Sequence, residues 1–563
     1  MKIRRLGRFL PSGRNALLAL LAGVILILAF PDFDLWFLAW FALVPLLWAI
    51  GRETERGPSR PHERDGVRID GNNPSSPVRP LGSRGQECPR SFVLGWLFGN
   101  VFFFGTCWWL TFAPINYASF PAPLAYFLLF CVTSTAAVFP GIFAAITAFL
   151  LKRFGSIAIL VVPFVWVFSE FARYWITGNN WNAIGYSMGS RPGDRLFVAS
   201  YGGVLLCSFY LLFISSALLY PLFQIMRGKS IRPLVPFFVY SFIVGSLLFA
   251  ASDAPDAGSG QPDQPRTTVV AIQPNVPMSG LSLEKWRELR KRHVQLAESA
   301  LAKIDERRST NDDHSITVIF PESPMNFMYD EDRETQDFIN GFARKNNVSV
   351  LFNSAEPNHA DGKYFNSAVM VGPDGTKTAQ YDKIYLLPFG EAVPFPFDFI
   401  VPAFVGSFSY GSEYDLLPLG DAKAGVMICF ESHFGQLSRE YVRNGADVII
   451  ELTNDGYLGP TPVLRQHLAN AALRAVETNR PVLRVTNVGI TAYINERGEV
   501  LDAADSYVEA TRIWSVAKSD GSQTFYTKYG DWFAWLCSFL TLGSLLIGLA
   551  IRRPGLNDRE KEV

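Results

Sequence analysis

The sequence predicts a polytopic α-helical membrane protein that carries one large α/β domain outside the cytoplasm. Hydrophobic residues make up 49% of the 563 residues and charged residues only 18%, against roughly a quarter charged in average soluble chains. The apolar residues are concentrated in the first half of the chain and in one stretch near its end. Between them, residues 252–531 alternate strand-like and helix-like segments, as layered α/β domains do.

Eight segments are apolar enough for membrane spans, since a span needs about 20 mainly apolar residues. They lie at residues 14–30, 35–50, 91–112, 121–151, 156–173, 196–223, 233–251 and 532–551. Only Pro31 to Asp34 separate the first two, which predicts a tight helical hairpin. A cleaved signal peptide is the alternative for residues 1–30, because basic residues precede the first apolar run. The immediate second span and the lack of a small-residue cleavage pattern favour a retained anchor.

The distribution of Lys and Arg gives the orientation, because cytoplasmic loops carry an excess of both. If eight helices alternate, the basic segments all fall on one side: the N-terminus, the arginine-rich loop 51–90, Lys152-Arg153, the loop after the sixth span and Arg552-Arg553. Residues 252–531 then fall on the opposite side. We therefore expect both termini in the cytoplasm and the large domain outside it.

The chain thus divides into three parts. Residues 1–251 hold seven spans and the polar loop 51–90, residues 252–531 form the outer domain, and residues 532–563 hold the last span and a cytoplasmic tail. The net charge is zero, which gives no sign of a nucleic-acid partner. In the outer domain we expect strands near 267–273, 316–320, 348–353, 367–371, 424–429, 448–452, 482–486 and 491–494, and helices at 283–303, from 434 and at 462–477.

Cys429 is the only one of six cysteines that lies in the outer domain. A domain with one cysteine cannot form an internal disulfide, and a free thiol in an oxidising compartment is a liability unless it is used. The ordinary alternative is a small buried hydrophobe. The residues around Cys429 favour a reactive role.

Three segments of the outer domain present polar side chains at or near strand ends. Glu322 follows the strand-like run VIFP, Cys429 follows GVMI, and YDKIYLLPFGE contains both Lys383 and Glu391. Ligand crevices of open α/β sheets lie outside the carboxyl ends of the strands, so these side chains can converge. A thiol attacks as thiolate, so it needs a base, for which Glu322 is the candidate, and a helix that begins just beyond Cys429 would favour the thiolate. Lys383 is the candidate donor for negative charge that develops on a carbonyl oxygen.

Several of these segments resemble the motifs of a known family. FPES around Glu322, YDK ending at Lys383 and ICFE around Cys429 resemble the Glu, Lys and Cys motifs of the nitrilase superfamily. PFGE ending at Glu391, together with the arrangement of spans, is similar to the bacterial apolipoprotein N-acyltransferases. Further stretches that fit are EFAR (170–173), YFNS (364–367), TNDG (453–456), QHL (466–468), RAVE (474–477) and RVTN (484–487).

This resemblance implies a fold, a reaction and a location. The outer domain would be a nitrilase-type αββα sandwich in the periplasm, above the inner membrane, and the reaction would need no metal or cofactor. Glu322 would take the proton of Cys429, the thiolate would attack the sn-1 ester of a phospholipid, and Lys383 would stabilise the oxyanion. The thioester would then acylate the α-amine of the S-diacylglyceryl cysteine of an apolipoprotein, the last step of lipoprotein maturation. The implied partners are a phospholipid donor, diacylated apolipoproteins and the bilayer.

The resemblance also implies supporting residues and shows two departures. Glu391 is expected to orient or compensate Lys383, and Glu431 to shape the pocket or its backbone donors. The other expected supporting residues are Phe430, Asn366 and Asn454. Phe430 stands where the family usually has Tyr, and Tyr457-Leu458 replaces a Trp-Phe pair.

Alternatives of other kinds stay open at this point. A membrane-tethered amidase or nitrilase-like hydrolase would use the same residues, with water resolving the thioester. A transporter with an outer accessory domain is disfavoured, because the spans hold almost no ionisable residues. His433 suggests a Cys–His pair, which the Glu and Lys motifs disfavour. Glu170 and Arg173, three residues apart on a helix, are interpreted as a structural pair.

Overall fold

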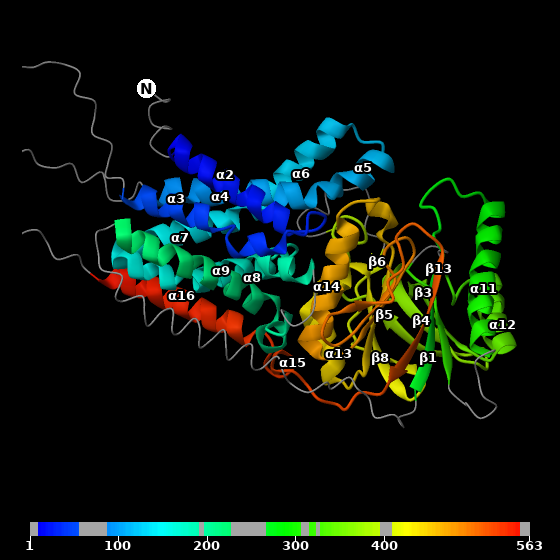
Figure 1. The fold of residues 1–563 in the computed structure, drawn as a ribbon. Helices are drawn as coiled ribbons and strands as arrows, with labels where there is room; N and C mark the ends of the chain where they lie inside the picture. Colours follow the sequence, from blue (N-terminus) through cyan, green and yellow to red (C-terminus); the bar gives the residue numbers. More distant parts are fainter. Residues whose placement is uncertain are drawn as a thin grey trace, which may run out of the picture.

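The structure, a computed structural model, describes residues 10–55, 87–190, 196–226, 266–305, 315–322, 327–393 and 408–551. The predicted span 233–251, residues 252–265 and most of the loop 51–90 lie outside the described residues. Figure 1 shows two parts side by side: a bundle of helices and a layered α/β domain, with the last helix returning to the bundle.

The bundle contains the apolar helices of the described residues. Its elements are α2 (Gly13–Ala29), η1 (Trp36–Trp40), α3 (Val44–Glu55), α4 (Glu87–Cys107), η3 (Trp108–Thr111), α5 (Phe112–Asn116), α6 (Ala122–Ala136), α7 (Val138–Phe154), η4 (Gly155–Leu160), α8 (Val162–Thr177), η5 (Ile184–Ser190), α9 (Ala199–Met226) and α16 (Trp532–Ala550). Within the described residues, five helical stretches are long and apolar enough to cross a membrane: Trp36–Thr54, Pro89–Asn116, Ala122–Leu160, Ala199–Ile225 and Trp532–Ala550. Gly13–Ala29 is apolar but shorter. The chain therefore has the helices of a membrane protein, and the count of eight spans stays a prediction.

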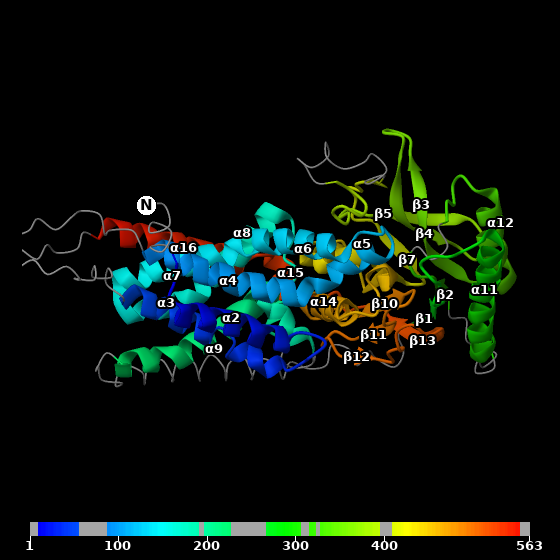
Figure 2. The same cartoon turned by 90° about the horizontal axis from the view of Figure 1, so that it is seen from above.

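The predicted span 121–151 differs from the structure. It is two helices, α6 and α7, that meet at Ala137. With η4 they form a stretch of 39 residues, about twice what a bilayer requires. Residues 108–136, which we call the arm, lie at the end of the bundle nearest the α/β domain (Figures 1 and 2). There the hydroxyl of Tyr117 donates to the carbonyl oxygen of Gly456 at 3.3 Å.

The α/β domain is built on two sheets. The first has the strand order β13-β1-β2-β3-β4-β5, with β6 also paired to β4, and the second has the order β12-β11-β10-β9-β8-β7. The strands are β1 (Arg266–Gln273), β2 (Ile316–Ile319), β3 (Ser349–Asn358), β4 (Lys363–Val371), β5 (Lys377–Asp382), β6 (Phe408–Ser409), β7 (Leu416–Leu419), β8 (Ala422–Ile428), β9 (Val448–Thr453), β10 (Val482–Thr486), β11 (Ala492–Ile494), β12 (Val500–Leu501) and β13 (Ala510–Ala517). The central pairs β1–β2, β2–β3, β8–β9 and β9–β10 are parallel.

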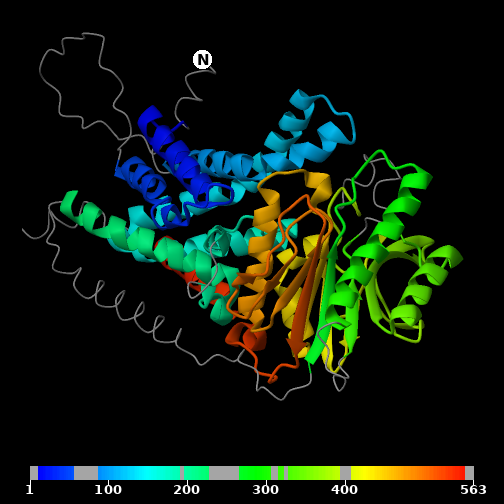
Figure 3. The same ribbon diagram turned by 45° about the vertical axis from the view of Figure 1, so that its right-hand side comes forward.

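Side chains alternate between the two faces of each sheet, and both faces are covered, so the domain has four layers. One face of each sheet contributes to a shared core, in which Ala271, Leu351, Met370, Val426, Ile450 and Val485 are all fully buried. Helices α11 (Leu283–Asp305) and α12 (Arg333–Asn346) cover the other face of the first sheet. Helices α13 (Gly435–Arg443) and α14 (Val463–Thr478) cover the second sheet and separate it from the bundle (Figure 3). The expected αββα arrangement is therefore present.

The bundle depends on close contact between α4 and α7 at Gly95. A Cβ atom at this position would overlap the backbone carbonyl oxygen of Pro140, and backbone cannot move aside as a side chain can. We expect Gly95→Ala to lower the free energy of unfolding by about 1–3 kcal/mol, the usual effect of overpacking. Thermal unfolding in detergent measures it. Gly543→Ala on α16, where a Cβ meets nothing within 4 Å, is the control, and an equal Tm for both variants would contradict the prediction.

Candidate active site

The three side chains expected to react follow strands of both sheets and meet between them. Cys429 comes directly after β8, Lys383 directly after β5, and Glu322 lies three residues beyond β2. The Lys383 Nζ lies 3.7 Å from Glu322 Oε1, and the Glu322 carboxylate and the Cys429 thiol are close enough for each to shift the pKa of the other. Lys383 is 1% exposed and Glu322 is 7% exposed, so their charges face each other away from bulk water.

Glu391, Asn366 and Asn454 lie around this cluster. Glu391 Oε1 lies 2.9 Å from Lys383 Nζ and accepts from Asn366 Nδ2 at 2.7 Å. The same Asn366 nitrogen is 3.3 Å from Glu322 Oε1. The backbone N–H of Asn454 donates to Glu322 Oε2 at 3.1 Å. The ammonium group therefore lies between two carboxylates, each of which also accepts from an asparagine.

Burial and the neighbouring charges shift the pKa of all three side chains. It raises the pKa of Glu322, an effect that Lys383 partly offsets. Burial and the charge of Glu322 raise the pKa of Cys429 well above its usual value, and Lys383 only partly counters them. Burial lowers the pKa of Lys383, but Glu391 and Glu322 outweigh it and the net direction is upward. The thiol therefore rests protonated at neutral pH, and it needs a base to react as the thiolate.

Glu431 connects the lysine-bearing segment to the cysteine-bearing strand. Its Oε1 accepts from the Tyr381 hydroxyl at 2.7 Å and from the backbone N–H groups of Ile384 and Tyr385 at 2.8 and 3.0 Å. Its Oε2 accepts from the N–H of Ile428 at 2.8 Å. The side chain is fully buried, and burial raises its pKa to about 7. One carboxylate thus fixes two segments that are 50 residues apart in the chain.

The backbone of Cys429 adopts an unusual conformation. Its φ is +52°, a left-handed value that costs a non-glycine residue about 1–3 kcal/mol. Cys429 begins η9 (Cys429–His433), a five-residue 3-10 helix. The carbonyl oxygen of Cys429 lies 3.0 Å from Nε2 of His467, a residue of α14. The nucleophile candidate is therefore held by its backbone as well as by its side chain.

A group of four buried charged side chains lies behind Cys429. His467 Nδ1 is 2.8 Å from Asp455 Oδ1, and its Nε2 is 3.1 Å from Glu451 Oε1. Arg484 pairs with Glu451 at 2.6 Å and with Asp455 at 2.7 Å. All four side chains are between 0% and 3% exposed. We call Glu451, Asp455, His467 and Arg484 the buried quartet.

Phe430 and His433 belong to an aromatic stack at the boundary with the bundle. Trp181, from the loop between α8 and η5, lies parallel to Phe430 at 6.5 Å and over His433 at 5.0 Å. The Tyr186 ring also stacks on His433, with 5.5 Å between the ring centroids. Burial lowers the pKa of His433 well below its usual value, so the ring is neutral. These contacts favour a packing role for His433 over the Cys–His alternative.

Side chains of the bundle hold this stack in place. Gln466 of α14 accepts from the indole N–H groups of Trp109 and Trp181, at 3.2 Å in each case. Its own amide donates to the carbonyl oxygen of Thr106 at 3.0 Å. The Trp181 carbonyl accepts from Arg173 at 2.9 Å. The end of α4, the 178–183 loop and α14 are thereby joined next to Phe430.

Glu170 and Arg173 also serve this loop. Glu170 accepts from the N–H of Ile184 at 2.9 Å, and Arg173 donates to Asn180 at 3.1 Å in addition to Trp181. The guanidinium lies over the Phe103 ring at 4.9 Å. Glu170 and Arg173 thus hold the loop that carries Trp181 through separate contacts.

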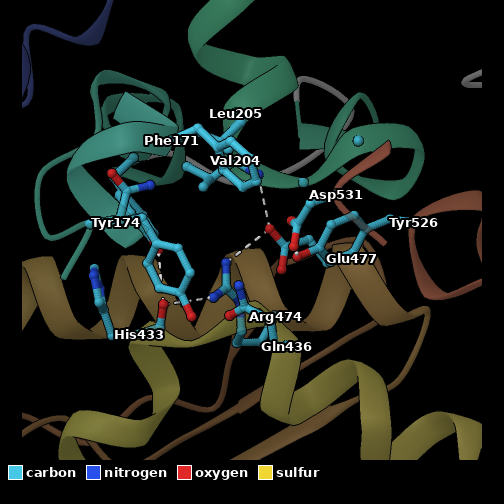
Figure 4. Close-up of a pocket in the computed structure, with 15 residues that line it drawn as sticks. Phe171, Tyr174, Val204, Leu205, His433, Gln436, Arg474, Glu477, Tyr526 and Asp531 are labelled. Carbon is cyan, nitrogen blue, oxygen red and sulfur yellow. Dashed lines mark hydrogen bonds and ion pairs between the residues drawn. The ribbon is translucent and has the colours of Figure 1, made fainter. Parts of the chain in front are cut away.

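A cavity at the same boundary is separate from the three candidate catalytic side chains (Figure 4). Arg474 donates to the carbonyl oxygen of His433 at 3.1 Å and to Glu477 Oε1 at 2.9 Å. Glu477 Oε1 in turn accepts from the N–H of Val204, at the kink of α9, at 3.0 Å. Figure 4 shows these contacts crossing from α14 to the bundle. The cavity therefore marks an interdomain contact.

Sequence reasoning assigned no role to the buried quartet, to Trp181 or to Gln466. A signal was present for two of them. Glu451 and Arg484 each stand inside an otherwise apolar run, VIIELT and VLRVT, that forms a fully buried strand. A charge is rarely buried without a partner, so these two residues predict each other. Asp455, Gln466 and His467 lie in the stretches TNDG and QHL that fit the family, but that fit assigns them no role. Trp181 carries no comparable signal, because its position depends on the packing of α14 against the bundle.

Known protein families match both the helical bundle and the α/β domain. The family described as carbon-nitrogen hydrolase matches residues 306–524, and the apolipoprotein N-acyltransferase N-terminal domain matches residues 22–60 and 81–217. The apolipoprotein N-acyltransferase of Geobacter metallireducens is 29% identical over 97% of each chain. That of Thermotoga maritima is 27% identical over 94% of this chain and 93% of its own. The solved structure of Saccharomyces cerevisiae Nit3, a nitrilase-superfamily member, covers 45% of this chain and 90% of its own at 17% identity, with a TM-score of 0.35.

The α/β domain is a carbon-nitrogen hydrolase domain joined to membrane helices. The relatives named above align with this chain over nearly its whole length, so the family assignment applies to the bundle and the α/β domain together. The chain belongs to the apolipoprotein N-acyltransferase family and is an acyltransferase.

The contacts of Glu431 give a testable prediction. In Glu431→Gln an amide N–H₂ group would face backbone N–H or hydroxyl groups whose hydrogen bonds the carboxylate now accepts. We expect a loss of about 1–3 kcal/mol of stability for each buried donor left without an acceptor. Thermal unfolding in detergent measures it, with Glu440→Gln as the control, because Glu440 pairs with Arg443 at the surface. Equal unfolding temperatures for the two variants would show that Glu431 does not join the two segments.

Proposed function

We propose that the chain transfers a fatty acyl group from the sn-1 ester of a phospholipid to the α-amine of the S-diacylglyceryl cysteine of an apolipoprotein, the last step of lipoprotein maturation. The observation that carries the proposal is that the buried Glu322 and Lys383 lie together with the half-buried Cys429 beside Trp181, a residue of the membrane bundle. A carboxylate, a cation and a thiol beside the bundle would suit a lipid carbonyl that arrives from the bilayer. The names of the relatives support an apolipoprotein as acceptor.

The first half-reaction would acylate the enzyme. Glu322 takes the thiol proton as the sulfur of Cys429 attacks the ester carbonyl, because a thiol whose pKa is raised is not ionised beforehand. Lys383, whose raised pKa keeps it charged, stabilises the oxyanion. The C–O bond to glycerol then breaks, the leaving oxygen takes the proton from Glu322, and lysophospholipid departs. A thioester remains on Cys429.

The second half-reaction would return the enzyme to its starting state. The α-amine of the acceptor attacks the thioester, Glu322 accepts a proton from the amine, and Lys383 again faces the oxyanion. Collapse breaks the C–S bond, the thiolate is reprotonated, and an amide leaves. The three side chains supply base, charge and nucleophile, so the proposed reaction needs no metal or cofactor. Glu391, Asn366 and Asn454 would fix the base and the cation, and Phe430 and Glu431 would fix the surroundings of the nucleophile.

We infer the orientation from the charge pattern, and the kind of membrane from the family resemblance. We place the chain in the inner membrane of a two-membrane bacterium, with eight spans, both termini cytoplasmic and residues 252–531 periplasmic. Phospholipid and acceptor are both anchored in the membrane, so an active site beside the bundle suits them. The loop with Trp181 and the arm would then lie on the periplasmic side, next to the outer leaflet.

Intact-mass analysis tests the proposal. Purified enzyme in detergent is incubated with dioleoylphosphatidylethanolamine and then with a synthetic diacylated lipopeptide. We expect a hydroxylamine-labile oleoyl adduct that Cys429→Ala lacks, followed by a third acyl chain on the peptide. An adduct that is lost only to water would indicate a hydrolase instead, and no adduct would remove the phospholipid donor.

Glu322→Gln should slow thioester formation by ~10²–10⁴-fold, the usual contribution of a general base. In the wild type the rate should also fall on acidification. A raised carboxyl pKa means that the basic form is lost as pH falls through a value above the usual 4.5. Single-turnover mass spectrometry across pH measures both effects. Glu356→Gln is the matched control, because Glu356 is also buried and lies 3.6 Å from a lysine, Lys377, away from the site.

A further inference from the structure

His467 is surrounded by acceptors. Its Nε2 lies 3.0 Å from the carbonyl oxygen of Cys429 and 3.1 Å from Glu451 Oε1, and its Nδ1 lies 2.8 Å from Asp455 Oδ1. A carbonyl oxygen cannot donate. The two carboxylates are both paired with Arg484, at 2.6 and 2.7 Å, and arginine has only donors to offer them. Neither acid therefore needs a proton of its own.

These contacts define the protonation state of the ring. A nitrogen without a proton would direct a lone pair at an acceptor oxygen, so both nitrogens carry protons and His467 is an imidazolium. Two cations and two anions then make the buried quartet neutral. Burial and Arg484 lower the pKa of His467, but Asp455 and Glu451 outweigh them and raise it to about 9.

The carbonyl that His467 binds belongs to the strained residue of the site. Cys429 has a φ of +52°, and such conformations persist only where the surroundings hold them. At the other end of η9, the carbonyl oxygen of His433 accepts from Arg474 at 3.1 Å and from Tyr186 at 3.3 Å. His467 and Arg474 lie seven residues apart on α14, two turns along one face. One helix thus fixes the backbone at both ends of the segment that begins with the thiol.

We propose that His467 is a positioning residue for acyl transfer: its imidazolium holds the carbonyl group of Cys429 and thereby directs the thiol toward Glu322 and Lys383. The proposal deepens the function proposed above and rests on it, because it takes Cys429 as the nucleophile. The buried carboxylates Glu451 and Asp455 keep the ring charged and oriented, and Arg484 keeps the carboxylates charged. His467 itself touches no reacting atom.

His467→Gln tests the role directly. Glutamine keeps much of the bulk and one donor group, but it has no charge and cannot donate toward Asp455 and Cys429 at once. We expect single-turnover formation of the oleoyl thioester to slow by ~10²-fold, the effect of a displacement of about 1 Å at a reacting group. His293→Gln is the matched control. His293 is also buried in the α/β domain, but its Nδ1 contacts the Leu289 carbonyl of its own helix, at 2.7 Å.

The pH profile separates positioning from general stabilisation. A raised histidine pKa means that the charged form is present below the usual value of 6.5 and is lost as pH rises through about 9. The wild-type rate of thioester formation should therefore fall near that pH. The groups that face the ring are Glu451 from β9, Asp455 from η10 (Asp455–Leu458) and Arg484 from β10, with Cys429 and the neutral His433 from η9. The bundle presents uncharged Trp181.

Asp455→Asn provides an independent variant. It keeps an acceptor for Nδ1 but removes one of the two charges that raise the pKa, so the alkaline fall in rate should move to lower pH. Neither Lys383 nor Cys429 accounts for that movement: the pKa of Lys383 is raised still further, and ionisation of the thiol would speed the attack.

The outcomes are distinct. A slow His467→Gln variant, a normal His293→Gln variant and an alkaline fall that Asp455→Asn shifts would support positioning. A wild-type rate in His467→Gln, or an alkaline limb that Asp455→Asn leaves in place, would overturn it. If His467→Gln does not fold, the wild-type and Asp455→Asn profiles decide alone. Absence of any thioester on wild-type Cys429 would instead overturn the proposed function, and this proposal with it.

Discussion

Helix α14 has to bury charge on both of its faces, and the partners of those charges fix the relation between the two halves of the molecule. Toward the sheet, His467 joins the buried quartet. Toward the bundle, Glu477 accepts from Val204 of α9, and Gln466 binds two tryptophans. A charge without a partner costs several kcal/mol in a water-poor interior. The helix therefore has few other positions in which all these groups are satisfied.

Helix α14 and Glu431 fix the geometry of the candidate active site. The strands bring the three reactive side chains to one place, but strand ends alone leave the direction of a side chain open. Glu431 sets the distance between the segments after β5 and β8, and α14 holds the carbonyl groups of η9. The loop of Trp181 adds a wall that belongs to the bundle. The candidate active site of the carbon-nitrogen hydrolase domain thereby lies against helices that are long and apolar enough to cross a membrane.

The sequence predicted more of the interior than of the boundaries. The central strands β1, β2, β3, β8, β9 and β10 lie within a few residues of their predicted positions, because strands buried on both faces read as apolar runs. The edge strands β5 and β7 were not predicted. One reads KTAQYD and the other contains Pro418, and the half-exposed position of an edge strand requires no apolar pattern.

The candidate site shows the same division. Glu322, Lys383 and Cys429 follow strands whose positions the hydrophobic pattern gives, so their convergence could be predicted from the sequence. The roles of Trp181 and Gln466 could not, because each depends on how two domains pack. The role of His467 could not either, because it depends on how α14 packs on the sheet of its own domain. The two helices within residues 121–151 were missed for a related reason. Hydropathy records that a segment is apolar, but it does not record that Ala137 divides it.

The two carboxylates around Lys383 have a chemical consequence for the proposed intermediate. A thioester is an acyl donor to any free amine, and a lysine next to it would ordinarily compete with the intended acceptor. Glu322 and Glu391 hold the Lys383 nitrogen as an ammonium ion, which has no lone pair with which to attack. An acyl chain on Cys429 would thus be protected from transfer to the enzyme's own lysine, and it would remain available for an amine from the acceptor.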